Sequence, residues 1–475
     1  MIKSGDVNND TLQLRRPVKQ IRQGKVADPY RSIKRAIWWY FWLLIFEGAL
    51  RKWVLPGLST PLLVVRDPIA LYIVLAASSK GLLKSNIFVF GMVSIATFAM
   101  FTTLILGHQN LPVAIYGVRI FLFHFPMMFV IGKVFTHGDV IKMGKIVMYI
   151  AIPMAVLIGL QFYSPQSAWV NRGLGDDASG AGFSGALGYF RPPGTFSFTT
   201  GNSLFFGFAA AFVMYFLFNP KKINKLILLG ACMAVVVSIP LSISRTLTFQ
   251  IAGTVGFAFI AILSNPKNLG KGLVAVFALT LVFLALSKSS LFQTATNVLS
   301  TRFNNAGSSE GGLEGTLGDR YLGGLLFSLS SAADQPFFGY GLGMGTKVGA
   351  QLLSGNRRAW LIAEAEWGRL VGEMGALMGL SVIALRVVFV FRMSFIGYFR
   401  MIKGDMLTWM LLSYGFMLIA QGSWGQPTSL GFSTLIGGLM LASLNNPEFK
   451  AKVAQRKRVP VMPRPDFDTM NTNNV

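Results

Sequence analysis

Long runs of apolar residues are the feature that most constrains the fold of this chain. An α-helix needs about 20 mostly apolar residues to cross ~30 Å of hydrocarbon. Only 13% of the 475 residues are charged, against roughly 25% in an ordinary soluble domain. We therefore expect an all-α integral membrane protein with about 12 transmembrane helices, at 36–50, 62–78, 87–106, 111–135, 146–163, 199–218, 226–243, 247–264, 273–288, 376–392, 406–421 and 430–444.

The net charge of +24 is distributed unevenly along the chain. Residues 1–35 carry nine Lys or Arg and residues 445–475 carry six, and the short basic loops fall on the same side as these tails. The positive-inside rule makes that side the cytoplasm, so both termini are expected there. Basic clusters beside apolar spans usually meet anionic lipid. We therefore expect a lipid bilayer as partner and no nucleic acid.

Two kinds of site are not expected. Cys232 is the single cysteine and lies inside the predicted span 226–243, so the outer loops contain no disulfide. The sequence also shows no Cys/His cluster with metal-ligand spacing, and we expect neither a metal nor another cofactor. Residues 1–35 are mostly polar and no cleavage pattern follows the first apolar run, which favours a retained anchor over a cleaved signal.

The chain divides into two tails, two groups of spans and one large loop. The basic tail 1–35 precedes spans one to nine (36–288), which include a glycine-rich outer loop at 164–198. A large outer loop (289–375) then precedes the last three spans (376–444) and the tail 445–475. Within the large loop, leucine spacing predicts an amphipathic helix at 319–333, followed by a flexible turn at 339–345 and a second helix at 360–374. No internal repeat supports a transporter built from inverted halves.

Isolated charges inside the predicted spans have two interpretations. Glu47, Arg66, Asp67 and Arg119 must face the bundle interior or a water-filled cavity, because exposure to lipid costs several kcal/mol. They either form ion pairs that brace helix ends, as the spacing of Glu47 and Arg51 allows, or contribute to a functional site. The sequence leaves both readings open.

Three arginines lie at or beyond the outer ends of apolar segments, where few basic residues are expected. Arg191 stands in Phe-Arg-Pro-Pro-Gly-Thr-Phe (190–196), Arg245 in Ser-Ile-Ser-Arg-Thr (242–246), and Arg320 in Gly-Asp-Arg-Tyr (318–321). Proline stiffens the chain beside Arg191, a tight helical hairpin holds Arg245, and an expected helix begins at Arg320. Guanidinium groups fixed in this way suit a diphosphate. One such arginine alone is more often a helix-end residue that reaches toward the headgroups.

Carboxylates near the end of the large loop supply a candidate general base. Glu366, Arg369 and Glu373 share one helical face, so a solvated face with ion pairs is the simpler interpretation. Glu364 lies off that face. A carboxylate in a cleft between membrane and loop can act as general base. Of the three histidines only His108 lies in an outer loop, and it is the weaker candidate.

The order and sidedness of these motifs resemble the O-antigen ligase and polymerase superfamily, which are integral membrane glycosyltransferases of the GT-C type. The likeness runs from about 190 to 380 and includes Pro-Phe-Phe-Gly-Tyr-Gly (336–341). In that family a histidine followed by asparagine, some eleven residues before a Glu-x-Gly ending, is catalytic. Here Glu364 and Ala365 stand at those positions. Either Glu364 or Glu366 replaces the histidine as base, or the activity differs or is lost.

The resemblance implies a metal-independent enzyme of the bacterial inner membrane. It would transfer a glycan from undecaprenyl diphosphate to the hydroxyl of an acceptor glycan or lipid-linked glycan on the periplasmic face. Polymerase is favoured over ligase, since nothing indicates recognition of a lipid A core. Arg191 and Arg245 would hold the diphosphate with Arg320, and Trp360, Trp367 and Trp424 are candidates for stacking on sugars or for interfacial anchors. The alternative is a non-catalytic binder or transporter of lipid-linked oligosaccharide in an export system.

Overall fold

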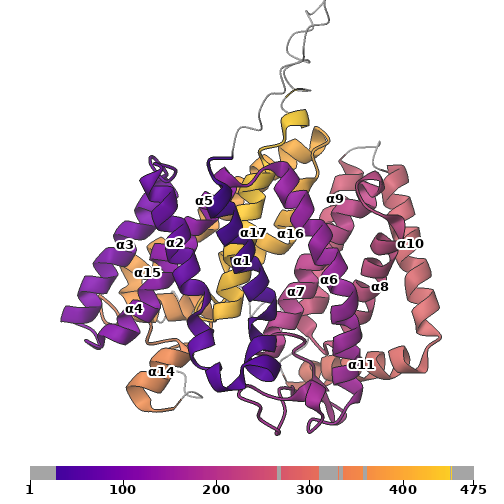
Figure 1. Cartoon of the computed structure of the whole chain (residues 1–475), viewed down its shortest axis with the longest axis horizontal. Helices are drawn as coiled ribbons and strands as arrows, with labels where there is room; N and C mark the ends of the chain where they lie inside the picture. Colours follow the sequence, from indigo (N-terminus) through magenta and orange to yellow (C-terminus); the bar gives the residue numbers. More distant parts are fainter. Residues whose placement is uncertain are drawn as a thin grey trace, which may run out of the picture.

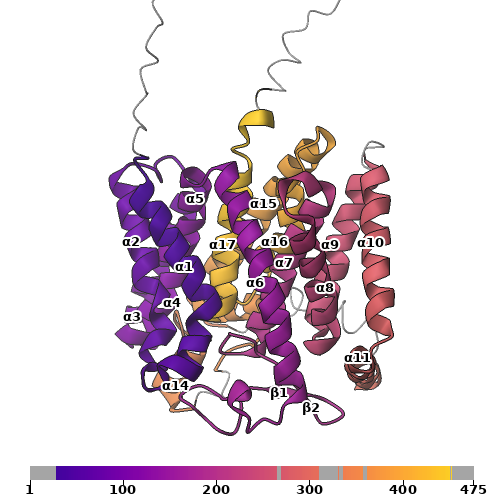
Figure 2. The ribbon, with the colours of Figure 1, turned by 45° about the vertical axis from the view of Figure 1, so that its right-hand side comes forward.

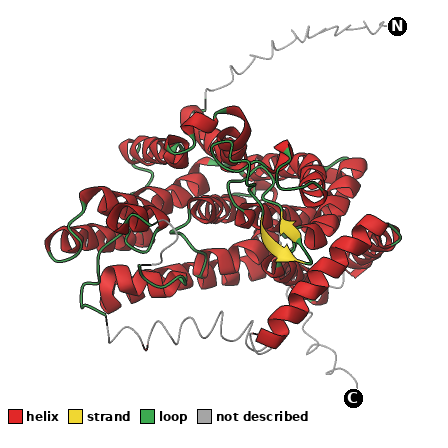
Figure 3. Ribbon diagram, turned by 90° about the horizontal axis from the view of Figure 1, so that it is seen from below, coloured by secondary structure: helices red, strands yellow, loops and turns green. Residues whose placement is uncertain are grey.

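Most described residues of the computed structural model are helical. The structure describes residues 28–264, 269–309, 330, 335–356, 361–449 and 451. Within these ranges one two-stranded antiparallel sheet is present, formed by β1 (Phe183–Ala186) and β2 (Tyr189–Arg191), and Figure 3 shows it beneath the helices. The expected all-α class is therefore confirmed apart from this short hairpin, whose strands are too brief to be read from the sequence.

Helices occupy all the segments for which apolar spans are expected. Two π-helical turns, η1 (Leu50–Val54) and η4 (Ile120–His124), extend α1 and join α4 to α5. The 3₁₀-helix η3 (Pro61–Val64) leads into α2. The α-helices are α1 (Arg31–Ala49), α2 (Arg66–Ser79), α3 (Ile87–Ile105), α4 (Leu111–Arg119), α5 (Phe125–Val134), α6 (His137–Tyr163), α7 (Thr199–Phe218), α8 (Lys225–Leu241), α9 (Arg245–Leu263), α10 (Leu269–Ser287), α11 (Ser290–Ser309), α14 (Lys347–Ser354), α15 (Glu366–Ile402), α16 (Leu407–Ala420) and α17 (Pro427–Ser443).

Eight helical stretches in the described ranges are long and apolar enough to cross a membrane. They are Pro61–Ser79, Ile87–Ile105, Leu111–Val134, His137–Tyr163, Thr199–Phe218, Arg245–Leu263, Glu366–Ile402 and Pro427–Phe449. Helices α8 and α16 are shorter, and α10 and α11 meet at a bend of 101°. The apolar helices fit a lipid bilayer, whereas the count of twelve crossings stays a prediction.

The bundle has two distinct ends (Figures 1 and 2). The start of α1 and the end of α17, which are near the two ends of the described chain, lie at one end of the bundle, which we call the terminal end. The hairpin β1–β2, α11 and α14 lie at the opposite end, which we call the loop end. The polar and charged side chains that are candidates for a functional site lie at or near the loop end.

Small residues allow the central helices to approach each other closely. Helix α7 is almost entirely buried, and α17 packs against α5. A Cβ added to Gly437 would lie 2.7 Å from the sulfur of Met128, and one on Gly438 would lie 2.5 Å from Cβ of Ile131. Glycines at such positions are typical of helix contacts inside membranes. The outer helices instead expose large apolar side chains, including Phe90, Phe98 and Phe101 of α3, as a lipid-facing surface requires.

The large loop differs from expectation at two places. The helix expected at 360–374 begins at Glu366 and is broken from the rest of α15 at Gly375, which has φ of 76°. The glycine-rich turn 339–345, expected to be flexible, is largely buried and packs on this break. The amide of Tyr340 donates to the Gly372 carbonyl at 2.8 Å, and that of Gly341 donates to the Glu373 carbonyl at 3.0 Å. These two bonds satisfy carbonyls that a helix break would otherwise leave without partners.

Further glycines fit the same loop against α4. The backbone of Gly343 lies so close to Gly117 that a Cβ on Gly117 would meet the Gly343 nitrogen at 2.4 Å. The imidazole of His108 bonds the Leu342 carbonyl through Nε2 at 2.9 Å and accepts the Asn110 amide at Nδ1. His108 therefore holds the loop through Nε2, while Nδ1 makes a local bond that fixes the orientation of the ring. The helix expected at 319–333 lies outside the described residues, except for Ser330.

Candidate functional site

A polar segment at the loop end connects the motifs of two predicted diphosphate-binding arginines. Arg191 ends β2 and is half-buried. The side chain of Asn202, in α7, donates to the Pro192 carbonyl at 3.2 Å. The next residue, Ser203, donates to the hydroxyl of Ser244 at 3.0 Å. The first turn of α7 therefore holds the Arg-Pro-Pro-Gly motif next to the α8–α9 turn.

Arg245 is the first residue of α9. Ser244 caps this helix by accepting the Leu247 amide at 3.3 Å. The first turn contains no acidic residue, so the positive end of the helix dipole and the Arg245 guanidinium act together. A cation at the first turn of a helix is unfavourable for the helix alone. The helix N-terminus and the Arg245 guanidinium together, however, attract an anion. The hairpin covers this turn, because a Cβ on Gly185 would lie 2.7 Å from Cδ1 of Ile243.

A third arginine, absent from the sequence-based prediction, lies on α11. Arg302 donates from Nη1 to the Ser184 carbonyl of β1 at 3.3 Å. Its neighbour Phe303 packs edge-on against Phe249 of α9, with ring centroids 5.9 Å apart. Helix α11 thus contacts both the hairpin and the first turns of α9. We call Arg191, Arg245 and Arg302 the arginine cluster. Arg320, the third arginine predicted from the sequence, lies outside the described residues.

A second polar site, the loop-end cleft, lies between α4, α14, α15 and the start of α17. Its volume is about 90 Å³. Glu364 is exposed, precedes α15 and lines the cleft. The other lining residues are Leu63, Tyr116, Gly345, Thr346, Lys347, Val348, Glu366, Arg369, Ser423, Gly425, Gln426 and Pro427.

Glu366, the second candidate base, is held in a buried ionic network. Arg369 donates to both of its carboxylate oxygens, at 2.9 and 3.0 Å, and Arg386 donates to Oε1 at 2.9 Å. Arg369 also pairs with Glu373 at 2.6 Å. The expected ion pairs on this helical face are confirmed, but the face is buried rather than solvated. Two guanidinium partners leave Glu366 poorly placed to take a proton, so Glu364 is the stronger candidate.

The same network determines the role of Trp424. Its ring lies 3.8 Å beneath the Arg386 guanidinium, and the residue is fully buried. Trp424 is therefore not accessible for sugar stacking or for interfacial anchoring. The indole of Trp367 is half-buried and donates to the Ala420 carbonyl at 2.9 Å. Trp360 lies outside the described residues.

A chain of direct contacts runs from Ser197, three residues after the Arg-Pro-Pro-Gly motif, to the loop-end cleft. Arg51 donates to Ser197 at 3.0 Å and to Glu47 at 3.0 Å. The other oxygen of Glu47 accepts from Arg66 at 3.1 Å, and Arg66 in turn donates to the carbonyl of Pro427, which lines the cleft. The expected Glu47–Arg51 pair is confirmed. The isolated charges of the spans thus brace the helix ends and also link the two polar sites.

Asp67 of α2, which is half-buried, and Arg119 of α4, which is buried, form a separate pair. Their side chains are 2.6 Å apart, and Asp67 also bonds Nε2 of His124 at 2.9 Å. The other ring nitrogen of His124 bonds the Tyr40 hydroxyl at 3.0 Å. The guanidinium of Arg119 stacks over Tyr116, which lines the cleft, at 3.9 Å. This pair therefore supports the cleft from the membrane side.

Lys52 is a buried cation that the sequence-based reading missed. It lies in η1, one residue after Arg51, and is fully buried. Its ammonium donates to the Gly194 carbonyl at 2.7 Å and lies 4.4 Å from the Trp53 ring. Burial lowers the pKa of Lys52 to about 7. The sequence could have indicated Lys52, because Arg51 and Lys52 immediately follow a predicted span on its outer side, where few basic residues are expected.

Comparison with known proteins finds no matching family model, no similar curated protein and no similar solved structure. A function for this chain is therefore argued from its own residues and geometry. Among the described residues no three His, Cys, Asp or Glu side chains are grouped so as to hold a metal ion.

Proposed function

We propose that the protein is a membrane glycosyltransferase that binds a lipid-linked diphosphate glycan at the arginine cluster and transfers the glycan to an acceptor hydroxyl. The observation that carries this proposal is that Arg191, Arg245 and Arg302 lie on β2, α9 and α11, three elements that adjoin one another at the loop end. Three half-buried arginines from three adjoining elements suit the charge of a diphosphate. The resemblance of the motifs to O-antigen ligases and polymerases supports undecaprenyl diphosphate as the carrier.

The proposed reaction is a single displacement with inversion. The acceptor oxygen attacks the anomeric carbon of the lipid-linked sugar while Glu364 takes the acceptor proton. The bond between the anomeric carbon and the phosphate oxygen breaks, and its electron pair leaves with the lipid diphosphate. The arginine cluster stabilises the charge that develops on that oxygen. A single well-placed donor of this kind commonly contributes about 10²–10³ in rate.

The reaction implies a definite topology. The loop end lies at the periplasmic face of a bacterial inner membrane, and twelve crossings place both basic tails in the cytoplasm. The ionic chain through Arg51, Glu47 and Arg66 would keep the diphosphate site and the cleft in a fixed relation while the substrate binds. The proposed step also requires the substrate to extend from the arginine cluster to the cleft, so that the acceptor oxygen beside Glu364 comes within about 3–3.5 Å of the anomeric carbon.

Reconstituted protein supplied with lipid-linked repeat units tests the proposal. We expect Arg245→Lys and Arg302→Lys to lower glycan transfer by about 10²-fold or more, because lysine keeps the charge but loses the planar fork. Arg392→Lys is the matched control, since Arg392 is exposed on α15 and contacts neither site. Normal transfer by both cluster variants would contradict the diphosphate role.

The base is tested separately. Glu364→Gln removes the proton acceptor with little change of shape, so transfer should collapse while binding of the lipid-linked substrate persists. Glu448→Gln, an exposed carboxylate at the terminal end, is the control. Should wild type bind the substrate and carry it across the bilayer without releasing lipid diphosphate, the protein is instead a binder or transporter.

A further inference from the structure

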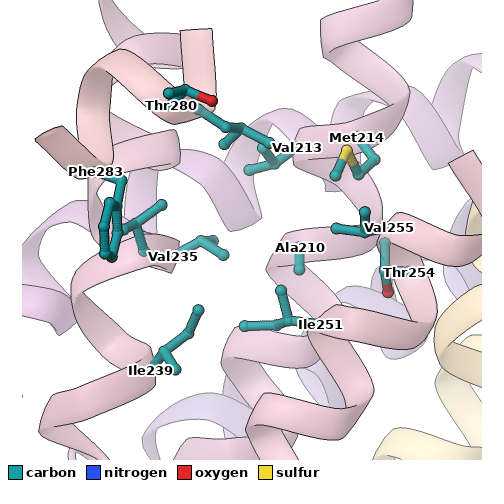
Figure 4. A pocket seen from close by; sticks show the side chains of 12 residues that line it. Ala210, Val213, Met214, Val235, Ile239, Ile251, Thr254, Val255, Thr280 and Phe283 are labelled. Atoms are coloured by element: carbon teal, nitrogen blue, oxygen red, sulfur yellow. The ribbon is translucent and has the colours of Figure 1, made fainter. Parts of the chain in front are cut away.

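An apolar cavity lies among α7, α8, α9 and α10, on the membrane side of the arginine cluster. Its volume is about 320 Å³, and two threonines are the only polar residues among the twelve that line it. Figure 4 shows Phe283, Val235 and Ile239 on one side of the space, facing Met214, Val255 and Ile251 on the other. The cavity is therefore suited to a hydrocarbon chain rather than to a polar ligand.

One helical hairpin, formed by α8 and α9, carries Arg245 of the arginine cluster and part of the cavity wall. Ile239 is three residues before Ser242, where the α8–α9 turn begins, and Ile251 is six residues after Arg245. At 1.5 Å per residue, the α9 wall runs from about 9 Å to about 15 Å below Arg245, at Ile251 and Val255. A molecule with an anionic head at Arg245 would therefore direct its tail along this wall.

The cavity is also accessible from the side of the bilayer. Val255 is 43% exposed and Phe283 is 50% exposed on the bundle surface. Apolar side chains that are this exposed on membrane-fitting helices contact hydrocarbon. A lipid tail can thus enter between α9 and α10 from the bilayer without its head leaving the membrane surface.

We infer that this cavity holds the polyprenyl tail of the lipid diphosphate whose head binds the arginine cluster, an inference that rests on the proposed function. The charge of the headgroup favours a lipid diphosphate over an ordinary phospholipid as the occupant. A diphosphate presents two linked phosphates to three arginines, whereas an ordinary phospholipid presents one phosphodiester. Because α9 contributes to both the head site and the tail site, the pair of sites would select a molecule with an anionic head and an apolar tail, and would fix the height of its first phosphate.

The test measures head and tail separately in the full-length protein, reconstituted in phosphatidylcholine nanodiscs. Inorganic pyrophosphate reports on the head alone, and geranylgeranyl diphosphate reports on head and tail. We expect wild type to bind geranylgeranyl diphosphate at least about tenfold more tightly than pyrophosphate. Val255→Trp fills the cavity and should remove that preference while leaving pyrophosphate binding unchanged. Val388→Trp is the matched control, because Val388 is similarly exposed on α15 and lies outside the cavity.

The outcomes separate this inference from the proposed function. A tail preference that survives in Val255→Trp, with thermal stability equal to that of Val388→Trp, overturns the inference and leaves the diphosphate site intact. Loss of the wild-type tail preference when phosphatidylglycerol is added overturns it too, because the cavity then takes bilayer phospholipid. Failure of both ligands to bind removes the proposed function as well. A preserved tail preference in a protein without transferase activity supports the lipid site and rejects only the chemistry.

Discussion

Arg386 offers the most direct test of the buried network behind the loop-end cleft. Its guanidinium is fully buried, pairs with Glu366 at 2.9 Å, and donates to the carbonyls of Ile419 and Gly422 at 2.8 Å each. Glu366, Glu373, Arg369 and Arg386 are together neutral. Arg386→Met leaves this group with one excess negative charge inside the protein.

The magnitude follows from that imbalance. Removing one partner of a buried ion pair typically costs about 3–5 kcal/mol, because the remaining charge is uncompensated. Each carbonyl that stays dry after the loss of its donor adds about 1–3 kcal/mol. We therefore expect Arg386→Met to lower the free energy of unfolding by at least about 3 kcal/mol. Arg392→Met, an exposed position on the same helix, should change it by less than about 1 kcal/mol.

A double variant separates charge from packing. Glu366→Gln combined with Arg386→Met restores neutrality, so the double variant should be more stable than the sum of the single effects predicts, by about 1–3 kcal/mol. Denaturant and thermal unfolding of the purified protein in detergent, followed by tryptophan fluorescence, measure all three. Additive effects, or an Arg386→Met protein as stable as Arg392→Met, would show that the network does not depend on charge balance.

Two further predictions concern the backbone break and the buried lysine. Gly375→Ala places a Cβ 1.9 Å from the Phe337 carbonyl oxygen, at a residue whose φ is 76°, so we expect gel filtration to show a loss of folded protein. Gly397→Ala on the same helix is the control. Its nearest neighbour would be 3.7 Å away, so this substitution should be neutral or slightly stabilising. Burial lowers the pKa of Lys52 to about 7 from 10.5, so the unfolded chain binds more protons between these values and stability should rise as pH increases from about 7 to 10. Thermal melting across this range should lose that rise in Lys52→Met but keep it in the control Lys403→Met, and an unchanged pH profile in Lys52→Met would place the titration elsewhere.

The sequence predicted the features that depend on local periodicity. Apolar runs located the helices, and the four-residue spacings predicted the ion pairs of Glu47 with Arg51 and of Arg369 with Glu373. Neither inference needs knowledge of tertiary contacts, because helical neighbours three or four residues apart meet in any environment. Whether those pairs are solvated does depend on packing. The burial of Glu366 was missed because its second partner, Arg386, lies twenty residues away beyond the break at Gly375.

The features that escaped the sequence are those created by long-range contacts. Arg302 enters the arginine cluster only because α11 lies across the hairpin and α9, a position set by Ser184 and Phe249. The turn 339–345 resembles a flexible linker in composition, yet its glycines serve close approach to α4 and α15. Gly341 and Gly343 both have positive φ, which glycine adopts without strain, so here a high glycine content signals tight packing instead of mobility.

Charge balance around the chain of contacts explains why an anionic ligand suits the loop end. The buried residues Arg51 and Arg66 both pair with the single carboxylate of Glu47, while Asp67 is paired with Arg119. Excess positive charge in a region of low dielectric disfavours further cations and favours an anion within a few ångströms. Under the proposed function, a diphosphate bound near these residues would offset the second arginine charge of the Arg51–Glu47–Arg66 group, so ligand binding should stabilise the helix ends that carry these residues.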